Sequence, residues 1–115
     1  MKSERELLTL AAKAMGIDLE SYIALGNVRS YMNKETGENW TSLHDDGDCA
    51  RLEAALGLDV VWYRDHVVSV CHDDEGRYVC SASEDYTDHN GDKNKARRWA
   101  STRAAAAVAE EMNHA

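Results

Sequence analysis

Three short runs rich in Val, Tyr and Trp fill residues 58–83 and restrict the folds that this chain can adopt. The runs read "LDVVWYR", "HVVSVCH" and "RYVCSAS". They are separated by the polar segments "DH", whose His66 also begins the second run, and "DDEG". Because β-branched and aromatic residues favour strands, the pattern predicts two consecutive hairpins that form an antiparallel meander. Val60 and Trp62 fall on one face of the first strand. Val61 and Tyr63 fall on the other, and apolar residues on both faces predict cover from other elements on both faces.

The segment before the meander begins with a predicted helix from Ser3 to Met15. Ser3 can cap the first free N–H groups, and Glu6 completes a capping box. Gly16 supplies the stop. Beyond it, "LESYIAL" and "VRSYM" are joined by Gly26-Asn27, and this arrangement predicts a β-hairpin. The apolar face of the predicted helix consists of Leu7, Leu8, Ala11, Ala12 and Met15.

An acidic stretch, "HDDGD" at 44–48, precedes a second predicted helix near residues 47–56. Asp45 or Asp46 is the expected N-cap, and Asp48 lies in the first turn. Carboxylates at these positions accept hydrogen bonds from free backbone N–H groups and favour the positive end of the helix dipole. Helix capping therefore explains the acidic cluster without any catalytic role.

A final helix is predicted from an N-cap at Asp92 to about Met112. Small side chains on its inner face let the helix axis approach whatever it covers. Its basic residues crowd the N-terminal half, whereas Glu110 and Glu111 lie near the C-terminal end. This order opposes the helix dipole, so we expect a tertiary partner or a ligand for these charges. The expected inner face is Ala96, Ala100, Ala104, Ala107, Val108 and Met112.

These elements predict an α+β fold in the order α-β-β-α-β-β-β-α, in which a hairpin and a three-strand meander form a small antiparallel sheet covered by helices. At 115 residues, the chain is expected to be a single domain, residues 1–115. No apolar run is long enough to cross a membrane, and charges occupy the N-terminal segment where a signal peptide is apolar. We therefore expect a cytoplasmic protein that does not bind membranes.

The net charge of −8 argues against direct nucleic-acid binding, which favours a basic surface for the phosphates. An acidic surface fits either plain solubility or a basic protein partner. The three cysteines, Cys49, Cys71 and Cys80, include no CxxC pair and are expected to be buried free thiols. Cys71 and Cys80 flank a short turn, which can bring them close across two strands, although a reducing cytoplasm disfavours a disulfide.

No metal, cofactor or catalytic residue is predicted. The His- and Asp-rich segments lack zinc-ligand spacings, and a calcium loop registered on Gly91 fails because Tyr86 and Arg97 occupy positions that need acids. The chain has no Gly-rich phosphate loop and no marked nucleophile. A paired-carboxylate mechanism that uses Asp45, Asp46 or Asp48 is the one catalytic alternative, and capping already accounts for these residues.

Candidate binding residues come from two regions. The basic residues from Lys93 to Arg98 lie near a helix start, where a phosphate or carboxylate can bind. The alternative that we favour is pairing with nearby acids such as Glu84, Asp85 and Asp88. In the other region, Trp40 is expected to pack against the second helix rather than to form an exposed stacking platform. The candidate set is Trp40, Asp45, Asp46, Asp48, Lys95, Arg97 and Arg98.

Two blocks of the sequence resemble a known family. The matching positions are Trp40, Leu43, Asp45, Asp46, Gly47, Asp48, Arg51 and Leu52, and then Arg97, Arg98, Arg103 and the alanines that follow. These residues resemble the phage alpha-beta-alpha (ABA) sandwich domain family of tailed bacteriophages and prophages. The chain departs from that pattern at Thr41-Ser42, where the family has Asn-Pro, and at Cys49, where Ala is common. The resemblance implies a phage-encoded accessory protein with a small helix-covered antiparallel sheet, and it transfers no catalytic residue.

Two functional hypotheses follow. In the first, the protein is a non-enzymatic binding module for a host or phage protein, for example an acidic mimic of DNA. In the second, it binds a nucleotide or another small phosphorylated ligand, with hydrolysis as an option, through Arg97, Arg98 and the Asp45–Asp48 turn. A ligand pocket requires the arginines to converge in a cleft, whereas a binding module lets them pair with acids. A homodimer is compatible with either hypothesis.

Overall fold

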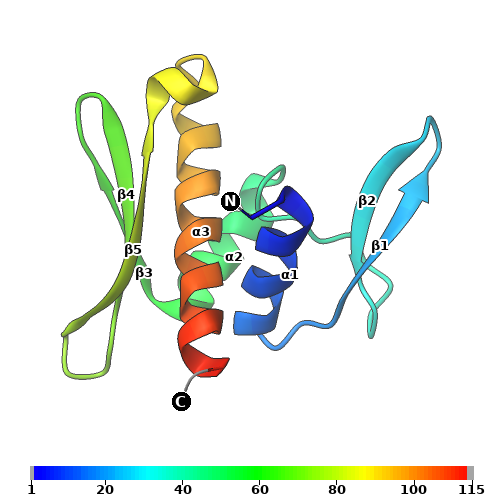
Figure 1. Cartoon of the computed structure of the whole chain (residues 1–115), viewed down its shortest axis with the longest axis horizontal. Coiled ribbons are helices and arrows are strands. Elements are labelled where there is room, and N and C mark those ends of the chain that lie inside the picture. Colours follow the sequence, from blue (N-terminus) through cyan, green and yellow to red (C-terminus); the bar gives the residue numbers. More distant parts are fainter. Residues whose placement is uncertain (1, 114–115) are drawn as a thin grey trace.

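Three helices and two antiparallel sheets follow one another in the order that the sequence predicts, which confirms the α+β class (Figure 1). The computed structural model describes residues 2–113. A 3₁₀ turn, η1, links the last strand to the last helix. The elements are α1 (Glu4–Ala14), β1 (Leu19–Ala24), β2 (Val28–Asn33), α2 (Asp46–Leu56), β3 (Leu58–Trp62), β4 (His66–His72), β5 (Tyr78–Asp85), η1 (Tyr86–His89) and α3 (Lys93–Asn113).

The helix boundaries follow from the predicted caps. Ser3 and Glu6 form the capping box of α1, in which the Ser3 side chain accepts from the Glu6 backbone and the Glu6 side chain accepts from the Ser3 backbone. Asp45 is the N-cap of α2, and its side chain accepts from the backbone N–H of Asp48. Gly57 ends α2 in the left-handed conformation, with φ of 64°, which a residue with a Cβ adopts at a cost. Local sequence rules therefore place both helices.

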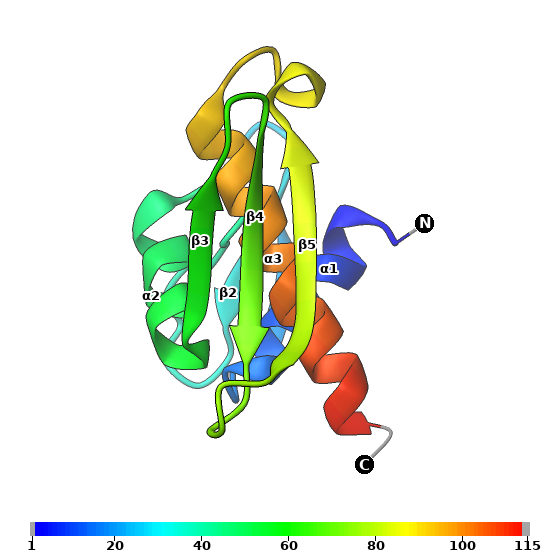
Figure 2. The ribbon, with the colours of Figure 1, turned by 90° about the vertical axis from the view of Figure 1, so that its left-hand side faces the viewer.

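The three-stranded sheet, in the order β3-β4-β5, packs only one face against the helices. Val67 on β4 and Ala82 on β5 are buried under α3. Figure 2 shows the opposite face turned toward the viewer with no helix in front of it, and Val61 on that face is 40% exposed. The prediction of cover on both faces is therefore wrong. Polar residues such as Ser81 and Ser83 interrupt the outer valines, and an antiparallel sheet can leave such a mixed face in water.

The last helix, α3, lies at the centre of the molecule, between the three-stranded sheet and α1 (Figure 1). Burial therefore extends around most of the helix, beyond the single inner face that the sequence suggests. The fully or almost fully buried residues of α3 are Ala96, Ala100, Ser101, Thr102, Ala104, Ala105, Ala106 and Ala109. Met112, an expected inner residue, is instead 57% exposed, because this end of α3 emerges from behind the sheet (Figure 2).

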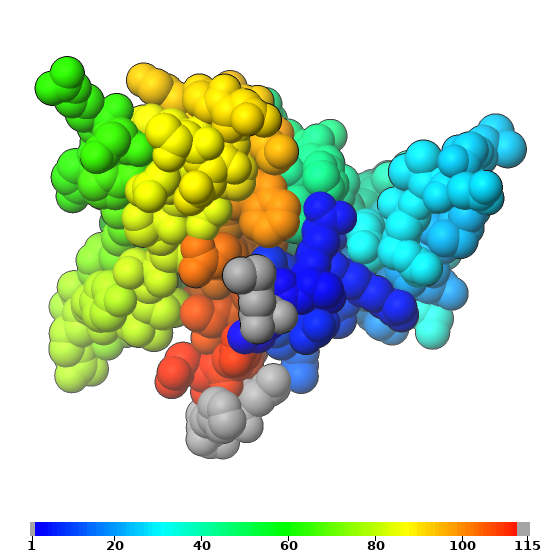
Figure 3. Space-filling model, turned by 45° about the horizontal axis from the view of Figure 1, so that its top comes forward, coloured from blue at the N-terminus to red at the C-terminus, as the bar shows by residue number. Residues whose placement is uncertain are grey.

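The two-stranded sheet projects from the opposite side of the body, away from the three-stranded sheet (Figures 1 and 3). We call residues 19–33, which comprise β1, β2 and their turn, the arm. Its base is anchored by Leu19 and Tyr31, which join the core cluster that contains Leu8 and Leu43. The outer part of the arm has no such cover. Within residues 2–113, no helix has the length and apolar character that a membrane crossing requires.

Candidate functional site

Arg97, a predicted anion ligand, is already paired with a carboxylate from another helix. Its Nη2 donates to Oε1 of Glu53 at 2.7 Å, and its Nε lies 3.1 Å from Oε2 of the same residue. Ser101 donates its hydroxyl proton to Glu53 Oε2 at 2.6 Å. Hydrogen bonding to Glu53 raises the pKa of the Arg97 guanidinium above its ordinary value, although burial acts the other way. This pair holds α3 against α2.

Arg98 makes a second link between the same two regions. Its Nε donates to the backbone carbonyl of Leu43 at 2.9 Å, and its Nη1 donates to Asp46 Oδ1 at 2.7 Å. The Arg98 side chain is only 15% exposed, so the guanidinium serves the loop before α2 rather than an open surface. A phosphate at this position would have to displace both a carboxylate and a carbonyl.

Lys93 and Arg103 also contact neighbouring side chains, whereas the contact of Lys95 comes from its backbone. Lys93 Nζ lies 5.3 Å above the Tyr86 ring centroid, and Arg103 is paired with Glu84 of β5. The Lys95 backbone N–H donates to Asp92 Oδ1 at 3.0 Å, as expected for an N-cap at Asp92. The favoured alternative, pairing with acids, therefore holds for the arginines of α3. The basic residues in the N-terminal half of α3 are explained by their tertiary partners Glu53, Asp46 and Glu84. Of these acids, only Glu84 was suggested from the sequence.

The acidic cluster divides into separate structural roles. Asp45 caps α2, and Asp46 receives Arg98. Asp48 is 8% exposed; its Oδ2 accepts from the Thr41 backbone N–H at 3.0 Å, and its Oδ1 accepts from Arg51 Nη2 at 2.6 Å. The three carboxylates are thus committed to the helix start and to the loop that precedes it.

Replacing Asp45 and Asp46 together by alanine should lower the free energy of unfolding by about 1–2 kcal/mol, because the variant loses an N-cap and the Arg98 partner. Chemical denaturation followed by circular dichroism measures the change. Asp74→Ala, in the exposed β4–β5 turn, is a control with no helix to cap. A double variant as stable as this control would contradict the capping role.

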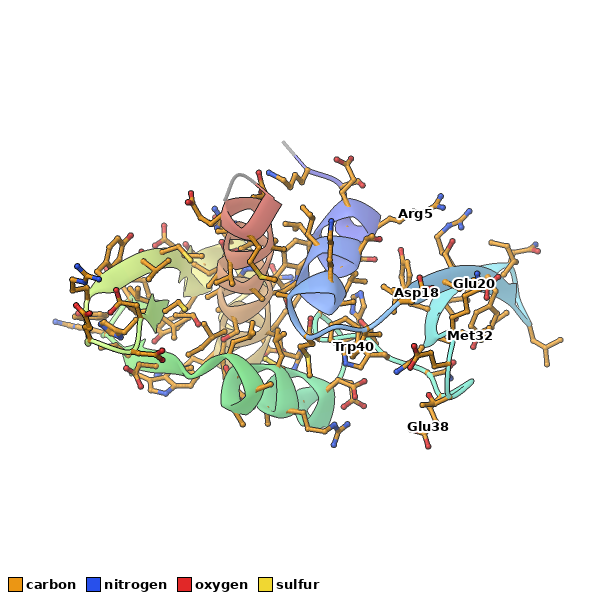
Figure 4. The ribbon with its side chains drawn as sticks, turned by 90° about the horizontal axis from the view of Figure 1, so that it is seen from below. Arg5, Asp18, Glu20, Met32, Glu38 and Trp40 are labelled. Carbon is orange, nitrogen blue, oxygen red and sulfur yellow. The ribbon has the colours of Figure 1, made fainter. Side chains whose placement is uncertain are left out.

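Trp40, the candidate stacking residue, is a core residue. It is 5% exposed and belongs to the cluster of Leu8, Tyr31 and Leu52. In Figure 4 the Trp40 side chain lies between α1 and the arm, whereas the labelled Glu20 side chain lies on the arm itself. The prediction that Trp40 packs rather than stacks is confirmed, and the ring joins the arm to the helices as well as bracing α2.

The most exposed apolar side chains on the arm lie at its tip, which the sequence analysis did not select. Leu25 is 99% exposed, Val28 is 58% exposed and Ile23 is 54% exposed. The signal in the sequence was the stretch "SYIALGNV" at 21–28, which has no charged residue in a chain that is 30% charged. In the strand register Ile23 is paired with Arg29 and Val28 is paired with Ala24, so Ile23 and Val28 lie on opposite faces of the hairpin with Leu25 in the turn between them. Exposed apolar residues gathered in one region mark interaction sites on soluble proteins.

A cleft also lies between α3, β5 and the N-terminal segment. Glu84, Trp99 and Arg103 line it, and none of the predicted binding residues does. Its charged walls are already paired: Arg103 with Glu84, and Lys2 with Glu110 at 2.8 Å. Within residues 2–113, no three His, Cys, Asp or Glu side chains come together in a way that could hold a metal ion.

Comparison of the chain with protein-family models, with curated proteins and with solved structures finds no match.

Proposed function

We propose that this chain is a cytoplasmic phage or prophage accessory protein that acts as a non-enzymatic binding module for a host or phage protein, and that the arm makes the contact. The phage origin rests on the resemblance of residues 40–52 and of the Arg- and Ala-rich α3 to the phage ABA sandwich domain family. The binding role rests on one observation, the exposed apolar tip formed by Ile23, Leu25 and Val28.

The physical state of the arm supports a protein partner. A two-stranded hairpin is marginally stable by itself in water, and only the base of this arm packs on the body. Covering the tip would remove apolar surface from water and fix the hairpin at the same time. The charged residue beside the tip is Arg29, the cross-strand partner of Ile23, which donates to Ser21 Oγ at 3.2 Å. A single arginine offers little to a phosphate backbone, which is bound through several basic side chains. A protein surface with an apolar groove is the partner that matches this chemistry.

The second hypothesis, a small phosphorylated ligand held by Arg97, Arg98 and the Asp45–Asp48 turn, has no comparable support. Both guanidinium groups face acids of α2 rather than converging in a cleft. Removing those acids would free the arginines only by loosening the contact between α2 and α3. The geometry therefore favours the binding module.

A photo-crosslinking amino acid at position 25, in the strain that naturally carries the gene, tests the proposal. We expect one discrete adduct with another protein from position 25 and none from position 74, which lies in the exposed β4–β5 turn. Ile23→Ser combined with Val28→Ser should reduce the adduct at least tenfold while the melting temperature stays unchanged, because both side chains are exposed.

Three results would contradict the proposal. Equal labelling from positions 25 and 74 would mean that the arm tip has no special role. An adduct that survives the double substitution would place the contact elsewhere. An adduct of twice the mass of the chain would identify a second copy, rather than a different protein, as the partner.

A further inference from the structure

Two of the three cysteines lie directly opposite each other on neighbouring strands. Cys71 of β4 and Cys80 of β5 are register partners, and they are 8% and 9% exposed. Both belong to the cluster that packs under α3 with Ala104, so both side chains lie on the inner face of the sheet. Opposed residues of antiparallel strands have Cα atoms about 4.5–5.5 Å apart, which is within the range of about 4.4–6.8 Å that disulfides span.

Each thiol lies beside a backbone carbonyl: Cys71 Sγ is 3.9 Å from the oxygen of Leu56, and Cys80 Sγ is 3.7 Å from the oxygen of Ala104. Burial is the main cause that raises the pKa of Cys80 to about 11, followed by the charge of Cys71 and a hydrogen bond with it. The next residue after Cys71 pairs with Tyr78, so Val79 is an extra residue on β5. A bulge of this kind interrupts the hydrogen-bond ladder and bends the strand locally. The backbone beside the pair is therefore less constrained by ladder hydrogen bonds.

We infer that Cys71 and Cys80 form an intrachain disulfide when the protein meets a small-molecule disulfide oxidant such as glutathione disulfide. The thiolate of one cysteine attacks the oxidant, whose S–S bond breaks; a mixed disulfide forms, and one glutathione thiolate leaves and takes up the proton. The second cysteine then attacks the protein sulfur of the mixed disulfide and expels the second glutathione thiolate, which is also protonated. Two protein thiols are oxidised, and one oxidant molecule is reduced to two thiols.

The third cysteine provides an internal comparison. Cys49 lies on α2, and its Sγ is 3.7 Å from Glu53 Oε2. Burial, followed by the charge of Glu53, raises its pKa to about 12. The thiolate is the reactive form of cysteine. Cys49 also lies on a helix rather than opposite another cysteine, so it should stay reduced under conditions that oxidise the pair. Because Cys80 is also protonated near neutral pH, closure of the disulfide should accelerate as the pH rises from 7 to 9. This site is independent of the arm and of the proposed binding function.

The test uses the full-length chain and glutathione disulfide. After oxidation, the protein is unfolded in N-ethylmaleimide to alkylate remaining thiols and is digested with trypsin without reduction. Cleavage after Arg77 separates the two cysteines, so the disulfide appears in mass spectrometry as a linked pair of peptides, 65–77 with 78–93. We expect this pair to dominate, with Cys49 recovered in its alkylated form in the peptide 35–51.

The Cys49→Ala variant is the matched control, because it keeps the opposed pair and should give the same linked peptides. A urea-unfolded sample is oxidised in parallel, and the time at which its thiols have reacted with glutathione disulfide is the time at which the native sample is analysed. Recovery of Cys71 and Cys80 as separate alkylated or glutathione-bound peptides at that time would overturn the inference. Linkage of either cysteine to Cys49 in the native chain would overturn it as well.

Discussion

Glu53→Ala should lower the free energy of unfolding by about 3–5 kcal/mol, as expected when one partner of a buried ion pair is removed. The Glu53 carboxylate is 13% exposed and its partner Arg97 is 17% exposed. Loss of the carboxylate leaves the guanidinium buried without a counterion, and it also leaves the Ser101 hydroxyl without its 2.6 Å acceptor. Denaturant unfolding followed by far-ultraviolet circular dichroism measures the change.

The position of Glu53 makes its loss affect three elements at once. The carboxylate comes from α2, Arg97 and Ser101 come from α3, and the Ser101 hydroxyl lies 3.1 Å from that of Ser69 on β4. The network therefore joins α2, α3 and the sheet at one point. A hydrogen-bonded network with several members couples their contributions, so single substitutions should not be additive.

Two comparisons separate this effect from a general loss of charge. Glu110→Ala removes the exposed ion pair with Lys2, in which both side chains are about two-fifths exposed (39% and 41%), and should cost less than about 1 kcal/mol. The double variant Glu53→Met and Arg97→Met should regain much of the lost stability, because no unpaired charge remains. A Glu53→Ala cost as small as that of Glu110→Ala would show that the pair is solvated and contributes little.

The parts of the fold that were predictable from the sequence are those set by near neighbours. Ser3 and Glu6 are three residues apart, and the capping box that they form needs no information from the rest of the chain. Asp45 and Gly57 mark the ends of α2 for the same reason. The alternating Val-rich runs of 58–83 likewise specify strands, since hairpin pairing joins segments that are adjacent in sequence.

The candidate site depended on contacts between distant segments, which local patterns do not reveal. Arg97 and Glu53 are 44 residues apart, and the sequence offered many other acids as partners. The small residues of α3 suggested one inner face, yet Ala105 and Ala109 bury a second face against other elements. The sequence indicated the hairpin, because turn residues such as Gly26 and Asn27 define one. It did not indicate that the hairpin extends away from the body, because turn residues carry no information about which other elements pack against the strands.

Trp40→Ala should lower the free energy of unfolding by about 3–5 kcal/mol, the usual cost of deleting a large aromatic side chain from a core. Trp40 touches the junction between the arm and the helices: its backbone N–H donates to the Tyr31 carbonyl at 3.0 Å, and its ring packs in the cluster that contains Leu8. The loss of the ring should therefore also loosen the arm, and amide hydrogen exchange in β1 and β2 should accelerate more than exchange in β4.

Trp40→Phe keeps an apolar ring at the junction and should cost about 1–2 kcal/mol, as a partial truncation leaves a smaller cavity. If Trp40→Ala were instead within about 0.5 kcal/mol of the unsubstituted protein, as is usual for surface substitutions, Trp40 would be a surface residue available for stacking, and the arm would be held by its other contacts.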